Sequence, residues 1–140
     1  MSTRPSPLTG LRILVVDDEP LVALMIEDLL ADLGCEVVGP VASVADALPL
    51  AQIAGLSGAL LDVNLGDEVV YPVAEVLQRA GIPFAFVTGY AGLGVAPEFA
   101  GAPVLRKPLD IYRFEEQVVA ALLGTHSPGS VSLIEPPALS

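Results

Sequence analysis

The sequence contains few of the residues that several common classes of function require. Its single cysteine, Cys35, excludes an internal disulfide and a thiolate metal site. Tryptophan is absent, and aromatic residues make up only 5% of the chain. Six basic residues stand against 17 acidic ones, which gives a formal net charge of −11. Binding to a nucleic acid or to an anionic membrane surface requires clustered Lys and Arg, so we expect neither partner.

Long apolar segments are also missing. The first ten residues, MSTRPSPLTG, lack the apolar stretch of a secretory signal peptide, and no run approaches the length of a membrane span. We therefore expect a cytoplasmic protein.

The residues that are present indicate one α/β domain. Apolar residues make up 53% of the 140, which is enough for one core, and charged residues only 16%. Short apolar runs alternate with stretches of helical period, a pattern typical of βα units around a parallel sheet. The five runs of strand length are residues 13–16, 36–41, 59–61, 84–87 and 104–105. We expect the domain to cover residues 11–123, with flexible segments at 1–10 and 124–140.

Capping residues predict helices between the first strands. Pro20 can open a helix at the position where its missing N–H costs nothing, and Gly34 can close it. Ser43 can cap a second helix, which Pro49 should kink or shorten.

The second half of the chain is less regular. Residues 63–67 are expected to form a loop. Residues 89–101 are rich in Gly, so a fourth helix there should be weak. Asp110 is expected to cap the last helix, with Ile111 on its inner face.

Polar residues stand where the apolar runs end. Asp17 and Asp18 follow the first run, Asp62 the third and Thr88 the fourth, and Lys107, the only lysine, lies just after the fifth. The carboxyl ends of parallel strands border the ligand crevice, so these side chains should lie together. Three close carboxylates repel one another unless a cation neutralises them, and Mg²⁺ suits such ligands. Asp62 could then attack a phosphoryl group, whose oxygens Lys107 and Thr88 would help to stabilise.

The order of these five polar residues, with Pro108 directly after Lys107, resembles the motifs of the receiver domains of response regulators over residues 11–123. The resemblance implies a flavodoxin-like, doubly wound sheet of five parallel strands in the order 2-1-3-4-5. It also implies a cis bond between Lys107 and Pro108.

The resemblance further implies a role for each polar residue. Asp62 is the phosphorylation site, and Thr88 and Lys107 contact the phosphoryl oxygens. The implied Mg²⁺ ligands are Asp18, Asp62, the backbone carbonyl of Asn64 and, through water, Asp17.

The function implied is that of a stand-alone response regulator in a phosphorelay. It takes a phosphoryl group from a histidine kinase or phosphotransfer protein and changes its affinity for a downstream protein. Autodephosphorylation aside, turnover of a small substrate is not expected. The sequence identifies neither the kinase nor the downstream protein, and it leaves a homodimer open.

One family feature is missing. Receivers usually place a Tyr or Phe three residues before the lysine, and this chain has Val104 there, so the usual aromatic switch is absent. Tyr90 could supply a ring instead. We expect phosphorylation to change the order of residues 89–101, because Gly residues make this segment easy to rearrange.

One class of enzyme shares part of this pattern. A Mg²⁺-dependent phosphatase of the haloacid-dehalogenase type also uses an Asp nucleophile after a strand. That family has Asp-x-Asp and usually a cap domain, whereas this chain has Asp62-Val63-Asn64 and no such domain. A receiver that serves only as a phosphate sink or a scaffold is a further alternative. A P-loop nucleotide enzyme is excluded because the Gly-x4-Gly-Lys-Ser/Thr pattern is absent.

Overall fold

Five parallel strands form the centre of the fold in the computed structural model, which describes residues 6–89 and 95–124. The strands are β1 (Arg12–Val16), β2 (Glu36–Val41), β3 (Gly58–Asp62), β6 (Phe84–Thr88) and β7 (Val104–Arg106). Their order across the sheet is β2-β1-β3-β6-β7. This confirms the predicted flavodoxin-like order 2-1-3-4-5.

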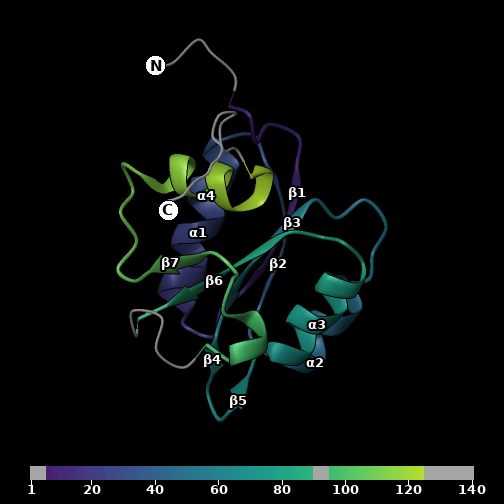
Figure 1. Cartoon of the computed structure of the whole chain (residues 1–140). Helices are drawn as coiled ribbons and strands as arrows, with labels where there is room; N and C mark the ends of the chain where they lie inside the picture. The colour runs from purple at the N-terminus through teal and green to yellow at the C-terminus, as the bar shows by residue number, and fades with distance from the viewer. Residues whose placement is uncertain (1–5, 90–94, 125–140) are drawn as a thin grey trace, which may run out of the picture.

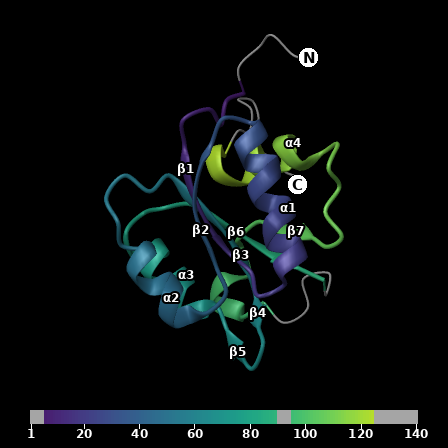
Figure 2. The ribbon, with the colours of Figure 1, turned by 180° about the vertical axis from the view of Figure 1, so that it is seen from behind.

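Helices cover both faces of the sheet (Figures 1 and 2). The two on one face are α1 (Pro20–Asp32) and α4 (Phe114–Leu123), and the two on the other are α2 (Val44–Leu50) and α3 (Tyr71–Arg79). Neighbouring residues of β1 pack on opposite faces of the sheet. Ile13 belongs to the apolar cluster beneath α1 and α4, and Leu14 belongs to the cluster beneath α2 and α3. A strand buried on both faces needs a continuous apolar run, which explains the sequence pattern.

Local signals set the ends of the first two helices as predicted. Pro20 occupies the first position of α1, and Gly34 follows its end with φ +85°. The Ser43 hydroxyl accepts a hydrogen bond of 3.1 Å from the backbone nitrogen of Asp46 and so caps α2. That helix ends at Leu50, directly after Pro49.

Two predictions of local structure are wrong. The segment expected to be a loop at 63–67 contains β4 (Asn64–Leu65), which pairs antiparallel with β5 (Glu68–Val69) through a turn at Gly66, where φ is +69°. The last helix does not begin at Asp110, whose carboxylate instead accepts a hydrogen bond of 3.0 Å from the Tyr112 nitrogen. This side-chain turn precedes α4 and leaves Ile111 52% exposed rather than inward.

The packed unit also begins earlier than predicted. Leu8 is fully buried in the cluster beneath α1 and α4. Its carbonyl accepts a hydrogen bond of 3.4 Å from Cys35 Sγ, and Gly10 N donates to Gly34 O at 2.8 Å. Residues 6–10, expected to be flexible, therefore pack against the end of α1 and the start of β2.

A regular fourth helix is missing from residues 95–101, in line with the prediction that it would be weak. This described stretch contains the 3-10 helix η1 (Pro97–Phe99). The Tyr71 ring stacks on Phe99 at 5.4 Å, and its hydroxyl accepts a hydrogen bond of 2.7 Å from Ala96 N. These contacts attach η1 to the start of α3.

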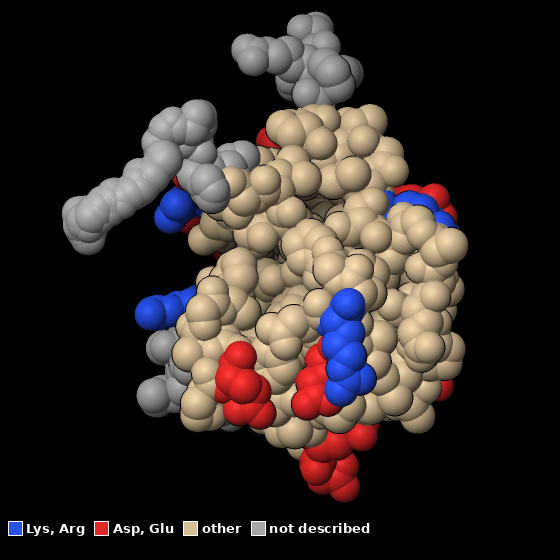
Figure 3. All heavy atoms as spheres, turned by 45° about the vertical axis from the view of Figure 1, so that its right-hand side comes forward, with Lys and Arg blue, Asp and Glu red and all other residues tan. Residues whose placement is uncertain are grey.

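Some predictions fall on residues that lie outside the described ones, namely residues 1–5, residues 90–94 with Tyr90, and the tail from residue 125 to residue 140. Within the described ranges, no helix combines the length and the apolar character needed to cross a membrane. Figure 3 shows that one face of the molecule is mostly uncharged, with basic side chains in a few separate places rather than in one continuous patch.

Candidate functional site at the carboxyl edge of the sheet

The polar residues that follow the strands meet at one edge of the sheet. Asp17 and Asp18 directly follow β1, Asp62 ends β3, Thr88 ends β6, and Lys107 directly follows β7. One cleft at this edge is lined by Asp18, Glu19, Asp62, Asn64, Thr88 and Lys107, among others. The fold thus brings together the residues that the sequence grouped.

Three carboxylates form the centre of the site. One carboxylate oxygen from each of Asp17, Asp18 and Asp62 lies within 4.8 Å of the other two. Asp17 and Asp62 are buried, at 3% and 5% exposure. The buried Asp17 Oδ2 makes no hydrogen bond within the described chain, although it lies 3.2 Å from Lys107 Nζ. Closely spaced hard oxygen atoms suit a small divalent cation, so these residues could hold a metal.

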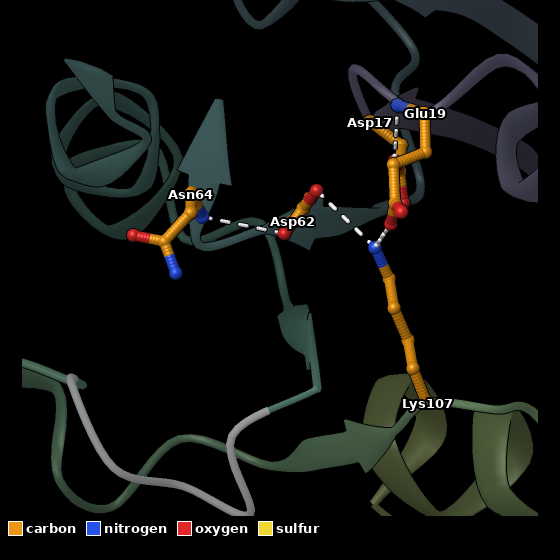
Figure 4. Close-up of polar contacts among 5 residues, drawn as sticks. All are labelled: Asp17, Glu19, Asp62, Asn64 and Lys107. Carbon is orange, nitrogen blue, oxygen red and sulfur yellow. Dashed lines mark hydrogen bonds and ion pairs between the residues drawn. The ribbon is translucent and has the colours of Figure 1, made fainter. Parts of the chain in front are cut away.

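Asp62 is held at both carboxylate oxygens (Figure 4). Its Oδ1 accepts a hydrogen bond of 3.2 Å from Asn64 N, and its Oδ2 accepts one of 3.3 Å from Lys107 Nζ. Burial, with a further contribution from the charge of Asp17, raises the pKa of Asp62 to about 7, although Lys107 and Asn64 act in the opposite direction. Without a cation this group is therefore only partly ionised at neutral pH. A bound cation would favour the carboxylate, which is the nucleophilic form.

Lys107 supplies a buried positive charge between several acids. Its Nζ lies 3.2 Å from Asp17 Oδ2 and 3.3 Å from Asp62 Oδ2, and it donates a hydrogen bond to Glu19 Oε1. Burial lowers the pKa of Lys107, but the hydrogen bond to Glu19 and the charges of Asp17 and Asp62 outweigh it, so the pKa is raised. The ammonium is therefore always charged at physiological pH.

Glu19 was missed by the sequence analysis. It follows Asp17 and Asp18 directly, and this adjacency was the only signal in the sequence. Its contact with Lys107 joins positions 88 apart, and only the arrangement of β1 and β7 in the sheet creates it.

The hairpin β4–β5 contacts both the start of α2 and Asp62. Val44 N, at the start of α2, donates a hydrogen bond of 3.0 Å to Glu68 Oε2. Figure 4 shows the Asn64 backbone nitrogen directed toward Asp62 and its side-chain amide directed away. The contact of Asn64 with Asp62 is therefore made by its backbone and not by its amide.

Thr88 and Lys107 are linked through the backbone. Thr88 is 1% exposed and lines the cleft, and its backbone carbonyl accepts a hydrogen bond of 2.9 Å from Lys107 N. The bond between Lys107 and Pro108 is cis, as the family resemblance implied.

Val104 occupies the position where receivers usually have an aromatic residue, and the aromatic rings come from neighbouring elements. Val104 pairs with Phe86 in the sheet and is half-buried. The centroid of the Phe86 ring lies 5.9 Å from that of Tyr71 and 5.8 Å from that of Phe99. The aromatic cluster is thus built from β6, α3 and η1 rather than from β7.

Comparison with known proteins identifies similar chains. No family model matches the sequence. The solution structure of SdrG from Sphingomonas melonis Fr1 is 44% identical, with a TM-score of 0.72, and the match covers 81% of this chain and 97% of SdrG. SdrG is also known in a BeF3-activated conformation. A CheY-like response regulator receiver domain protein from Methanospirillum hungatei JF-1 is 27% identical, with a TM-score of 0.71, and the match covers 83% of this chain and 96% of that one.

One curated relative is considerably longer. The phyllosphere-induced regulator PhyR of Methylorubrum extorquens AM1 is 32% identical over 81 residues, which are 56% of this chain. The match spans only 30% of the length of PhyR.

Proposed function

The chain belongs to the receiver-domain family of response regulators, and on this basis we propose that it accepts a phosphoryl group on Asp62 from a histidine kinase or a phosphotransfer protein. The observation that carries the proposal is the setting of Asp62. It ends the central strand β3, its carboxylate lies in the acidic cluster with Asp17 and Asp18, and it contacts the ammonium of Lys107. A carboxylate nucleophile, a cation site and a fixed positive charge are the parts that phosphoryl transfer requires.

In the proposed reaction a carboxylate oxygen of Asp62 attacks the phosphorus atom. A new O–P bond forms while the bond from phosphorus to the donor's histidine nitrogen breaks, and the product is an acyl phosphate. Lys107 and the Thr88 hydroxyl donate hydrogen bonds to the phosphoryl oxygens. When bound, Mg²⁺ supplies further positive charge to those oxygens, and its ligands would be Asp18, Asp62, the Asn64 carbonyl and, through water, Asp17.

Phosphorylation then changes the affinity for a downstream protein in a phosphorelay. We further propose that the protein acts in the cytoplasm and does not turn over a small substrate. A phosphatase of the haloacid-dehalogenase type is not favoured, because the position of that family's second acid is occupied by Asn64, whose side chain points away from Asp62 (Figure 4).

The proposal is tested by incubation with acetyl phosphate and Mg²⁺, followed by intact mass spectrometry. The wild type should gain one phosphoryl group, and Asp62→Asn should gain none. Asp67→Asn, which removes an exposed carboxylate from the β4–β5 turn, should behave as the wild type. Labelling of Asp62→Asn to the wild-type extent would contradict the assignment.

A further inference from the structure

The ammonium of Lys107 is shared by three carboxylates of different kinds (Figure 4). Asp17 and Asp62 are buried, with side chains 1% and 7% exposed, whereas the Glu19 side chain is 58% exposed. Asp17 and Asp62 both belong to the acidic cluster, and Glu19 does not. A cation in the cluster would bind Asp17 and Asp62. Of the three partners of Lys107, only Glu19 would then remain free of the cation.

The position of Glu19 is not explained by the helix that it precedes. Glu19 is the N-cap residue of α1, yet its side chain makes no capping hydrogen bond. Its backbone nitrogen donates to Asp17 Oδ1 at 2.9 Å, which fixes the main chain beside the cluster. The carboxylate instead accepts a hydrogen bond from Lys107 Nζ. The orientation of the side chain is thus set by Lys107.

We propose that Glu19 is a positioning residue that holds Lys107 in the unmodified protein and competes with the phosphoryl group for its ammonium. The inference rests on the proposed function, since it assigns a resting partner to the lysine of the same site. A cation neutralises Asp17 and Asp62 and weakens their hold on Lys107, which leaves Glu19 as its main partner. Because Glu19 is exposed, little free energy is lost when its ion pair with Lys107 breaks. A phosphoryl group carries more charge and more acceptor oxygens than one carboxylate, so Lys107 should move to it.

Two variants separate the reach of Glu19 from its charge. Glu19→Gln removes the charge, and Glu19→Asp keeps it but is one methylene too short to maintain the contact. Glu27→Gln is the matched control, because Glu27 lies on α1, the helix that begins directly after Glu19, and lines a groove with Asp17 and Asp18. It reports the effect of removing one negative charge near the site without touching Lys107.

The first measurement is the affinity for beryllofluoride at saturating Mg²⁺, followed by fluorine NMR. Both Glu19 variants should bind this phosphoryl mimic about two- to fivefold more tightly than the wild type, the range expected for a partly exposed ion pair. Glu27→Gln gives the correction for general charge. An affinity of Glu19→Gln no higher than that of Glu27→Gln, or of Glu19→Asp no higher than that of the wild type, would overturn the inference.

The second measurement observes Lys107 itself, which is possible because it is the only lysine in the chain. Selective ¹⁵N labelling of lysine gives a single side-chain ammonium signal. This signal should differ between the wild type and Glu19→Gln in the free state and coincide once beryllofluoride is bound, because Lys107 has then left Glu19. An equal difference in both states would overturn the inference. A wild type that fails to bind beryllofluoride with Mg²⁺ would instead refute the proposed function, and this inference with it.

Discussion

The buried charge of Asp62 should make the metal-free protein less stable as the pH rises. The pKa of Asp62 is about 7 in the folded protein, whereas an unperturbed aspartate has a pKa of 3.8. Between these two pH values the folded protein keeps a proton on Asp62 that the unfolded chain has lost. Stability therefore falls as the pH rises from about 4 to about 7 and is level above that. Asp62→Asn removes the charge at every pH, so it should stabilise the protein at pH 8 more than at pH 5.

The size of this effect follows from the same shift. A change from 3.8 to about 7 corresponds to about 4 kcal/mol. Water in the open cleft and the coupling to Asp17 reduce this figure, and we expect about 2 kcal/mol at pH 8. For a folded unit of this size, the melting temperature of Asp62→Asn should then lie about 8 °C above that of the wild type.

Thermal unfolding, followed by circular dichroism in the presence of a chelator at pH 5 and pH 8, measures the difference. Asp28→Asn is the control, because Asp28 is exposed on α1 and its loss should change the melting temperature little at either pH. A gain for Asp62→Asn that is the same at pH 5 and pH 8, or a loss at pH 8, would refute the reasoning about the buried charge.

Four further predictions test separate parts of the structure. Mg²⁺ at several times its Kd should stabilise the wild type by about 1 kcal/mol in a melting experiment and should leave Asp18→Ala unchanged; an equal rise in both would place the metal elsewhere. Leu8→Ala should cost about 2–5 kcal/mol in urea unfolding because Leu8 is fully buried, whereas Leu21→Ala, 81% exposed, should stay within about 0.5 kcal/mol; equal costs would contradict the packing of residues 6–10. Glu68→Gln should cost about 1 kcal/mol in the same assay by weakening the charge-assisted bond from Val44 N, and Asp67→Asn should cost little. Beryllofluoride should change amide exchange in residues 95–101, with the exposed face of α2 as the internal reference; changes confined to the surroundings of Asp62 would show that another surface carries the signal.

The fold and the grouping of the site residues could be predicted because both depend on short-range patterns. Continuous apolar runs are diagnostic of strands buried on both faces, and the residue that ends such a run must lie at the edge of the sheet. This rule alone predicts the positions of Asp17, Asp62 and Thr88 at the edge of the sheet. The starts of α1 and α2 could also be predicted from local sequence, because Pro20 and Ser43 each had only one expected structural role.

Other features depend on contacts that no local pattern contains. Asp110 can cap a helix or close a turn with the same carboxylate, and the turn is what forms before α4. Leu8 is one apolar residue between Pro7 and Thr9, so it carries no periodicity, and its burial becomes visible only when α1 and β2 are in place. The contact of Glu19 with Lys107 likewise forms only when β1 and β7 have taken their places in the sheet.

The most direct test of the account is to locate the phosphoryl group on the chain. After incubation with acetyl phosphate and Mg²⁺, borohydride reduces an aspartyl phosphate to homoserine, and peptide mass spectrometry identifies the converted position. The account predicts homoserine at position 62 alone, with no conversion when Mg²⁺ is removed. Conversion at position 17 or 18 with Asp62 intact would contradict it.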